Sequence, residues 1–264
     1  MVYEQAKVIG FIYALIFFVV LFALWYTKRW KRWTGIALLL VTIALGFLIF
    51  SPVIPWQFQM LVLGDVKGIG GPLAIAAVGI VVMLILSFLF GRFYCGYLCP
   101  IGAVQEIGSL APVPKLRLKS KIMPYLFRWA FFFVFIGAGL FLSYGLLSLF
   151  GIKDFFYLIF TTGFFIFLVI VLLSLFLYRP FCRFFCPFGA LASVTAMVSR
   201  FKIQRTDQCI ECKKCEQACP TNEAKRADLK AECYLCHRCL DVCPEGALKY
   251  TRVGSITSGT VKKE

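Results

Sequence analysis

Long apolar runs separated by short polar connections dominate the N-terminal part of the chain. Five runs come close to the roughly 20 residues with which an α-helix crosses a bilayer. They lie at Val8–Tyr26, Trp33–Ser51, Pro72–Phe90, Tyr125–Leu149 and Phe155–Tyr178. A chain in hydrocarbon must satisfy its own backbone polar groups, which favours helices. The pattern predicts a mainly α membrane protein, with a five-helix transmembrane bundle in a domain over residues 1–189.

The composition supports a lipid bilayer as the surroundings of this part of the chain. Hydrophobic residues make up 61% of the sequence and charged residues 16%, against about 45–50% and about 25% in ordinary soluble domains. We expect no cleavable signal peptide, because the first apolar run is too long for a signal core and basic residues follow it.

Basic residues gather in alternate connections between the runs. They are Lys28, Arg29, Lys31 and Arg32, then Arg92, Lys115, Arg117, Lys119 and Lys121, then Arg179, Arg183, Arg200, Lys202 and Arg205. The other connections are nearly neutral. With five crossings, the positive-inside rule places the N terminus outside and the C-terminal domain in the cytoplasm. We therefore predict a multi-pass protein of the inner (cytoplasmic) membrane. The net charge of +15 then reflects topology, and no nucleic acid is expected as a partner.

Eight of the twelve cysteines form two copies of the run C-x2-C-x2-C-x3-C-P. The copies are Cys209, Cys212, Cys215 and Cys219, then Cys233, Cys236, Cys239 and Cys243. Four thiolates hold a cubane cluster, and in two-cluster ferredoxins the fourth Cys of a run binds the other cluster. By that rule one 4Fe-4S cluster is held by Cys209, Cys212, Cys215 and Cys243. The other is held by Cys233, Cys236, Cys239 and Cys219.

Zinc is the alternative for such cysteines, but zinc sites usually show paired C-x2-C halves and often histidine. The chain has one histidine, His237, which lies between two predicted cluster ligands. A haem held by two histidines is therefore excluded, and we expect no haem.

The tail resembles the bacterial two-cluster ferredoxins over about 45 residues. The resemblance implies a small α+β two-cluster ferredoxin domain with pseudo-twofold symmetry, which we place at residues 207–250. Residues 190–206 are expected to be a linker, for which a short amphipathic helix on the membrane surface is one form. Residues 251–264 are expected to be a flexible tail.

Four further cysteines form a second repeat. Cys95-Gly-Tyr-Leu-Cys99-Pro-Ile-Gly-Ala recurs as Cys182-Arg-Phe-Phe-Cys186-Pro-Phe-Gly-Ala. Each copy follows a span that enters the cytoplasm, and residues i and i+4 share a helix face. We therefore expect the pairs to face each other in a four-thiolate site at the cytoplasmic boundary. Such a site could hold an additional iron or iron–sulfur centre, form reversible disulfides, or merely pack as small hydrophobes.

Together, two C-x3-C-P motifs after membrane spans and a two-cluster ferredoxin tail resemble the NapH/NosR-type membrane polyferredoxins over roughly residues 70–250. The chain shows no N-terminal flavin-binding domain, so the shorter NapH-like form is nearer. The resemblance implies electron transfer between the quinone pool, or a cytoplasmic donor, and a partner redox enzyme or cytochrome. The basic patches of the chain would favour an acidic donor such as a ferredoxin or flavodoxin. The chain would then be an electron-transfer subunit of a quinol dehydrogenase-like system. Two alternatives stay open: a maturation factor that reduces a metal or cofactor of another enzyme, and a membrane redox sensor.

Overall fold

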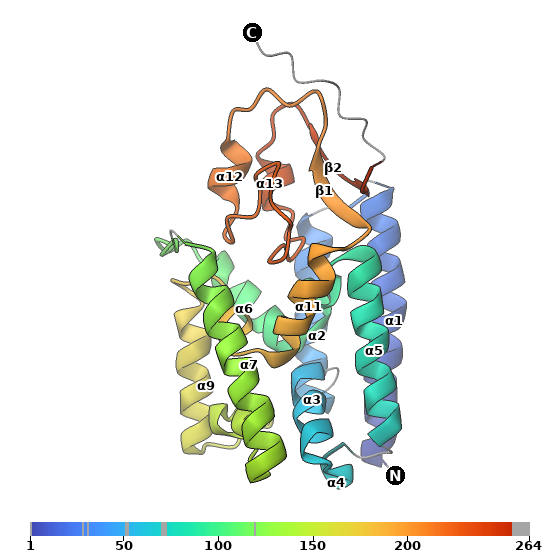
Figure 1. Ribbon diagram of the computed structural model, residues 1–264, viewed down its shortest axis with the longest axis vertical. Coiled ribbons are helices and arrows are strands. Elements are labelled where there is room, and N and C mark those ends of the chain that lie inside the picture. The colour runs from blue at the N-terminus through green and yellow to red at the C-terminus, as the bar shows by residue number, and fades with distance from the viewer. Residues whose placement is uncertain are drawn as a thin grey trace.

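The computed structural model describes residues 2–27, 29–30, 32–50, 53–69, 73–118 and 120–254. Ser51, Pro72, Lys28, Lys31, Lys119 and residues 255–264 of the expected tail lie outside these residues. Long helices stand side by side, and the C-terminal domain lies across one end of them (Figure 1). These helices are α1 (Val2–Tyr26), α2 (Arg32–Ile49), α5 (Leu73–Phe90), α7 (Ile122–Leu142) and α9 (Thr162–Leu173).

Three described stretches are long and apolar enough to cross a membrane: Trp33–Leu63, Leu73–Phe90 and Ile122–Leu142. The first contains α2 and a second, shorter helix. Helices α1, α2, α5 and α7 lie within or close to the first four predicted spans. The structure therefore supports a mainly helical protein with several apolar helices, while the count of five crossings stays a prediction.

The fifth predicted span differs from the structure. Residues 155–178 do not form one long helix, because the short α8 (Ile152–Phe156) is followed by a turn before α9. Helix α9 has 12 residues, about 18 Å of helix, which is shorter than the ~30 Å hydrocarbon core. The hydroxyl of Thr161 starts α9 by accepting from the backbone of Phe164 at 3.3 Å, and it donates to Asp154 at 2.5 Å. Polar capping inside an apolar run thus breaks the span.

Helix α7 is also shorter than predicted. It ends at Leu142, where Ser143 adopts a left-handed conformation (φ 50°) as the C-cap. The chain continues as a 3-10 turn, η2 (Leu146–Phe150). The predicted end of this span at Leu149 is therefore wrong by about two helical turns.

The described part of the segment after α2 forms two further helices, α3 (Ile54–Leu63) and α4 (Val66–Ile69). Helix α3 packs against α5, α7 and α11 (Pro187–Met197) inside the bundle. The reason is Gln59, whose side chain accepts from the backbone of Leu147 at 2.5 Å and donates to Ser148 at 3.1 Å. Because the amide of Gln59 has hydrogen-bond partners inside the bundle, this short helix can lie in the apolar interior.

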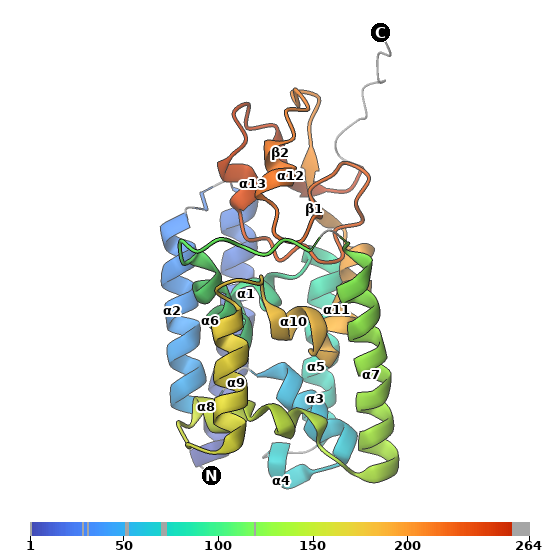
Figure 2. The ribbon, with the colours of Figure 1, turned by 90° about the vertical axis from the view of Figure 1, so that its left-hand side faces the viewer.

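Two hairpins enter the bundle from the end that carries the C-terminal domain (Figure 2). The first consists of a π-helical turn, η1 (Tyr94–Leu98), and α6 (Pro100–Leu110). The second consists of α10 (Pro180–Phe184) and α11 (Pro187–Met197). Each hairpin turns at the second cysteine of its C-x3-C-P motif. The proline that follows begins the new helix, because proline fits the first helical turn but not the interior.

The C-terminal domain contains a two-stranded antiparallel sheet and two short helices. Strand β1 (Phe201–Arg205) pairs with β2 (Leu248–Arg252), so that Phe201 faces Arg252 and Arg205 faces Leu248. The helices are α12 (Lys214–Ala218) and α13 (Arg238–Asp241). Residues 190–206, expected as a linker, instead form most of α11, a short connection and β1. The bundle thus passes directly into the sheet.

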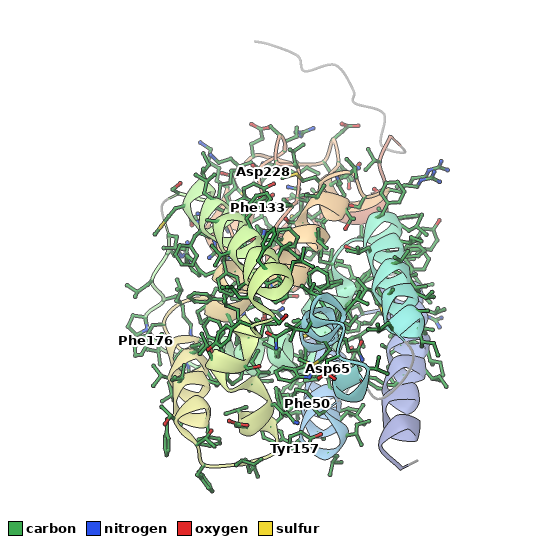
Figure 3. The ribbon with its side chains drawn as sticks, turned by 60° about the horizontal axis from the view of Figure 1, so that its bottom comes forward. Phe50, Asp65, Phe133, Tyr157, Phe176 and Asp228 are labelled. Atoms are coloured by element: carbon green, nitrogen blue, oxygen red, sulfur yellow. The ribbon has the colours of Figure 1, made fainter. Side chains whose placement is uncertain are left out.

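Aromatic packing holds the domain on the bundle. The Tyr250 hydroxyl donates to the carbonyl of Phe90, at the end of α5, at 2.6 Å. The ring of Phe22 from α1 lies 5.3 Å from that of Phe201 and 4.2 Å from that of Phe90, between centroids. Because these contacts join α1 and α5 to β1 and β2, the position of the domain on the bundle is fixed. Asp228 lies in this domain, whereas Asp65 and Tyr157 lie toward the opposite end of the bundle (Figure 3).

Candidate metal centres

The cysteines of the tail line two separate pockets. One pocket is lined by Cys209, Cys212, Cys215 and Cys243. The other, a cavity of about 430 Å³, is lined by Cys219, Cys233, Cys236 and Cys239. The fourth cysteine of each run therefore lies at the pocket of the other run, which is the pairing that the motif rule predicts.

The residues present fit clusters better than single ions. Among the described residues, no group of three or more His, Cys, Asp or Glu side chains is gathered around a position for one metal ion. A cubane distributes its four thiolates over four irons, so its site is a pocket walled by separated cysteines. The two tail pockets have this form. His237 does not line the first pocket or the cavity, and its Nδ1 lies 2.6 Å from Asp241.

Burial controls the protonation of the cysteines in the larger cavity. It raises the pKa of Cys233 to about 12 and that of Cys236 to about 11. Without iron these groups are neutral thiols near pH 7, whereas iron binds the thiolate. Binding of a cluster therefore has to displace protons, and loading and folding of this region are linked.

The four cysteines of the membrane part are also brought together. Cys95, Cys99, Cys182 and Cys186 are all buried, and they line one small pocket together with Pro55 and Tyr94. The backbone arrangement that brings them together differs from the prediction, because Cys99 and Cys186 do not lie on a helix face. Both have extended backbones and are the N-caps of α6 and α11.

This pocket lies inside the bundle. Helices α6 and α11 each have 11 residues, which is about 16 Å of helix, and both run from the pocket back toward the C-terminal domain (Figure 2). The second cysteine of each motif therefore lies about 16 Å of helix from that end of the bundle, and its position relative to the cytoplasmic boundary stays a prediction.

The surroundings of this pocket favour negative charge. Helices α3, α6 and α11 all begin beside it, each with a proline in its first turn, and a helix N-terminus carries partial positive charge. The backbone N–H of Gly189 donates to the sulfur of Cys186 at 3.2 Å. The guanidinium of Arg92 lies 4.0 Å from the sulfur of Cys95. Thiolates and the centres that they hold are anionic, so the pocket is suited to them.

A buried ionic network separates this pocket from the C-terminal domain. Glu232 accepts from Arg92 at 3.1 Å and from Arg128 at 2.6 Å. Glu106 accepts from Arg179 at 2.8 Å and from Arg238 at 2.7 Å. Burial alone would raise the pKa of Glu232, but the two arginines outweigh it, and the pKa lies below its usual value.

The sequence pattern did not reveal this network. Arg92, Arg179 and Arg183 were expected to be basic charges of the connections between spans, yet these side chains are fully buried. A signal was present, since an arginine stands three residues before the first cysteine in both copies of the membrane repeat. Extending the repeat from C-x3-C-P to R-x2-C-x3-C-P would have found Arg92 and Arg179.

The second tail motif touches the first hairpin directly. A Cβ on Gly96 would overlap the carbonyl oxygen of Tyr234, so glycine is needed at this point of contact. The hydroxyl of Tyr97 donates to the carbonyl of Leu235 at 3.0 Å. The loop between Cys95 and Cys99 therefore lies against the loop between Cys233 and Cys236.

Comparison with protein families gives three matches within the chain. A family model described as a 4Fe-4S binding domain matches residues 72–119 and again residues 159–206. Each match contains one C-x3-C-P motif. A second model, also described as a 4Fe-4S binding domain, matches residues 203–222, which contain the first ferredoxin run.

Several known proteins are similar to the chain. YccM of Escherichia coli (strain K12) is 31% identical over 171 residues, which are 56% of this chain and 46% of YccM. The uncharacterized protein MJ0750 of Methanocaldococcus jannaschii is 30% identical over 190 residues, 65% of this chain and 77% of that protein. The regulatory protein NosR of Pseudomonas aeruginosa is 31% identical over 179 residues, 59% of this chain and 25% of NosR. The chain thus spans less than half of the length of YccM. No solved structure matches the chain.

Proposed function

Because this chain belongs to the membrane polyferredoxin family, together with YccM, MJ0750 and NosR, we propose that it is a membrane-bound iron–sulfur electron-transfer protein. The name of YccM refers to electron transport. The chain would relay electrons between the quinone pool, or a cytoplasmic donor, and a partner redox enzyme. Substrate chemistry would take place on that partner.

One observation carries the proposal. The loop of Cys233 and Cys236 contacts the loop of Cys95 and Cys99, with the carbonyl of Tyr234 against Gly96. Electron transfer within one protein needs redox centres that the fold holds close together. Two cysteine-bearing loops in backbone contact meet this need across the boundary between domain and bundle.

The proposed centres follow from the pockets. Cys209, Cys212, Cys215 and Cys243 would hold one 4Fe-4S cluster, and Cys219, Cys233, Cys236 and Cys239 a second. Cys95, Cys99, Cys182 and Cys186 would hold a third iron or iron–sulfur centre. When bound, such centres supply one-electron oxidation and reduction. The protein positions them, and the positive helix ends near Cys99 and Cys186 stabilise their negative charge.

The order of the sites is set by exposure. Cys212 is exposed and the neighbouring Ile210 has 63% of its surface accessible, whereas Tyr234 and Leu235 of the second motif are buried. The first cluster would therefore exchange electrons with a water-soluble partner. The second would exchange them with the pocket inside the bundle.

The experiment that tests this function is a measurement of iron and acid-labile sulfide per chain on anaerobically purified protein, with electron paramagnetic resonance. Wild type is compared with a variant that carries Cys95→Ser, Cys99→Ser, Cys182→Ser and Cys186→Ser. Two cubanes correspond to about eight irons. We expect more than this in wild type and about eight in the variant.

Each proposed site has its own contradicting result. About eight irons in both proteins would confine clusters to the tail and leave the membrane cysteines as thiols or disulfides. A chain that binds no iron, or whose clusters cannot be reduced by any donor, would contradict the electron-transfer function as a whole.

A further inference from the structure

We infer that Tyr234 is a positioning residue, which sets the electronic contact between the second cluster site and the four-cysteine pocket inside the bundle. The inference rests on the proposed electron-transfer function and deepens it. It names the residue through which two of the proposed sites are held in register.

The ring of Tyr234 is shared by both hairpins. The guanidinium carbon of Arg92 lies 4.4 Å from the ring centroid, and that of Arg179 lies 4.7 Å from it. Each arginine precedes the first cysteine of its hairpin by three residues. The ring, which is 2% exposed, thus lies between the two copies of the membrane repeat.

The rest of Tyr234 is held equally firmly. Its hydroxyl donates to one oxygen of Glu232 at 3.2 Å, and the other oxygen of Glu232 accepts from Arg92 and Arg128. Its own carbonyl oxygen rests on Gly96. Arg179 in turn donates to the carbonyls of Cys95 and Gly96. Tyr234 is therefore fixed against both hairpins by its ring and against the first by its backbone.

The first tail motif shows that the ferredoxin fold does not itself need this residue. Ile210 occupies the equivalent place, directly after the first cysteine of its motif, and it is exposed to solvent. The side chain of Tyr234, which packs between the two arginines of the bundle, is therefore explained by the contact between domain and bundle.

The step that Tyr234 supports is the passage of one electron between two thiolate-ligated iron centres. The centre at Cys219, Cys233, Cys236 and Cys239 loses the electron and the centre at the membrane cysteines gains it, or the reverse. No bond to Tyr234 forms or breaks, and no proton moves. The ring and the two guanidinium groups fill the space between the loops and fix their separation.

The test uses the full chain with its metal loaded. Tyr234→Leu, Tyr234→Phe and the control Tyr144→Leu, which changes an exposed tyrosine after α7 that lines neither cluster pocket, are compared with wild type. Iron content and the resonance signals of the reduced clusters come first, because they report on the proposed function. Freeze-quench resonance after rapid one-electron reduction then gives the rate of exchange between the second cluster and the membrane centre.

We expect Tyr234→Leu to keep its iron and to slow this exchange by about tenfold or more, because small displacements of reacting groups have large effects on rate. Tyr234→Phe keeps the ring between the arginines and should stay near the wild-type rate. Tyr144→Leu should be unchanged. Tyr234→Met, which fills similar space without a ring, replaces Tyr234→Leu if the latter fails to assemble.

Three results would overturn the inference. An unchanged exchange rate in iron-replete Tyr234→Leu would remove the positioning role alone. Loss of the second cluster in Tyr234→Leu and Tyr234→Phe alike would show that the residue holds the cluster. About eight irons in wild type would remove the membrane centre and this role together, while the two-cluster relay would stand.

Discussion

Adding a methyl group at Gly96 would push the first hairpin away from the C-terminal domain. The added Cβ of Gly96→Ala would overlap the carbonyl oxygen of Tyr234, and neither backbone can move without displacing a cysteine loop. We expect a loss of about 1–3 kcal/mol in the free energy of unfolding, as for overpacking in a core. Thermal unfolding in detergent measures it. The matched control is Gly137→Ala in α7, where a Cβ meets nothing within 4 Å. Equal melting temperatures for the two variants would contradict the close contact.

The carboxylate of Glu232 neutralises two buried arginines, so Glu232→Gln should be costly. The change leaves Arg92 and Arg128, both fully buried, without their counter-charge. Breaking a buried ion pair from one side typically costs about 3–5 kcal/mol. Denaturant unfolding measures the loss. Lys121→Met removes a pair in which the lysine is 43% exposed and Asp228 5%. Because Asp228 keeps a hydrogen bond from the backbone of Lys225, the loss should be smaller than in Glu232→Gln. A loss in Glu232→Gln no larger than in Lys121→Met would show that the network is not stabilising.

Single residues show how far sequence alone reaches. The cysteine sets follow from spacing, because the run C-x2-C-x2-C-x3-C-P has few other uses. The burial of Arg92 and Arg179 cannot be predicted in this way. An arginine that follows an apolar run looks the same in the sequence whether it faces the cytoplasm or a buried glutamate. Only the three-dimensional contact with Glu232 and Glu106 separates the two cases.

Among the elements, α3 is a half-length helix whose amide side chain anchors it to η2. Gln59→Leu would leave the backbone N–H of Leu147, a residue with no exposed surface, without its acceptor. A buried donor left unsatisfied costs about 1–3 kcal/mol. The measurement is thermal unfolding, with Gln57→Leu on the half-buried part of the same helix as control. If Gln59→Leu raised the melting temperature, the hydrogen bonds would contribute less than the apolar surface gained.

The helices also differ in how well the sequence predicts them. Helices α1, α2 and α5 were predictable, because their apolar runs are long and uninterrupted. The pieces α3, α6, α10 and α11 were not, since a helix that crosses half of the bundle has the same apolar composition as one that crosses all of it. What distinguishes them is the partner of a single polar group, which no periodicity reveals. Examples are Gln59 in α3 and Gln105 in α6, which accepts from the backbone of Phe181.

For the whole molecule, the prediction concerns orientation. The C-terminal ends of α1, α6 and α11 lie at the end that carries the C-terminal domain (Figure 2), and Arg29, Lys115 and Arg200 follow them in the sequence. Helix α8, which contains Asp154, lies at the other end (Figure 2), toward which Asp65 also lies (Figure 3). The positive-inside rule then puts the cluster-bearing domain in the cytoplasm. An epitope tag at the C terminus should resist protease in intact spheroplasts and be lost after lysis. A tag at the N terminus should be accessible from outside. Cleavage of the C-terminal tag in intact spheroplasts would reverse the orientation.

The contact between the C-terminal domain and the bundle also bears on how the second cysteine pocket is assembled. The second cysteine pocket is closed partly by Tyr178 from the bundle and by Arg238, which Glu106 and Ser109 of α6 hold from below. Docking of the tail on the bundle therefore completes one wall of this pocket. If a cluster binds here, its loading and the docking of the domain would be linked steps.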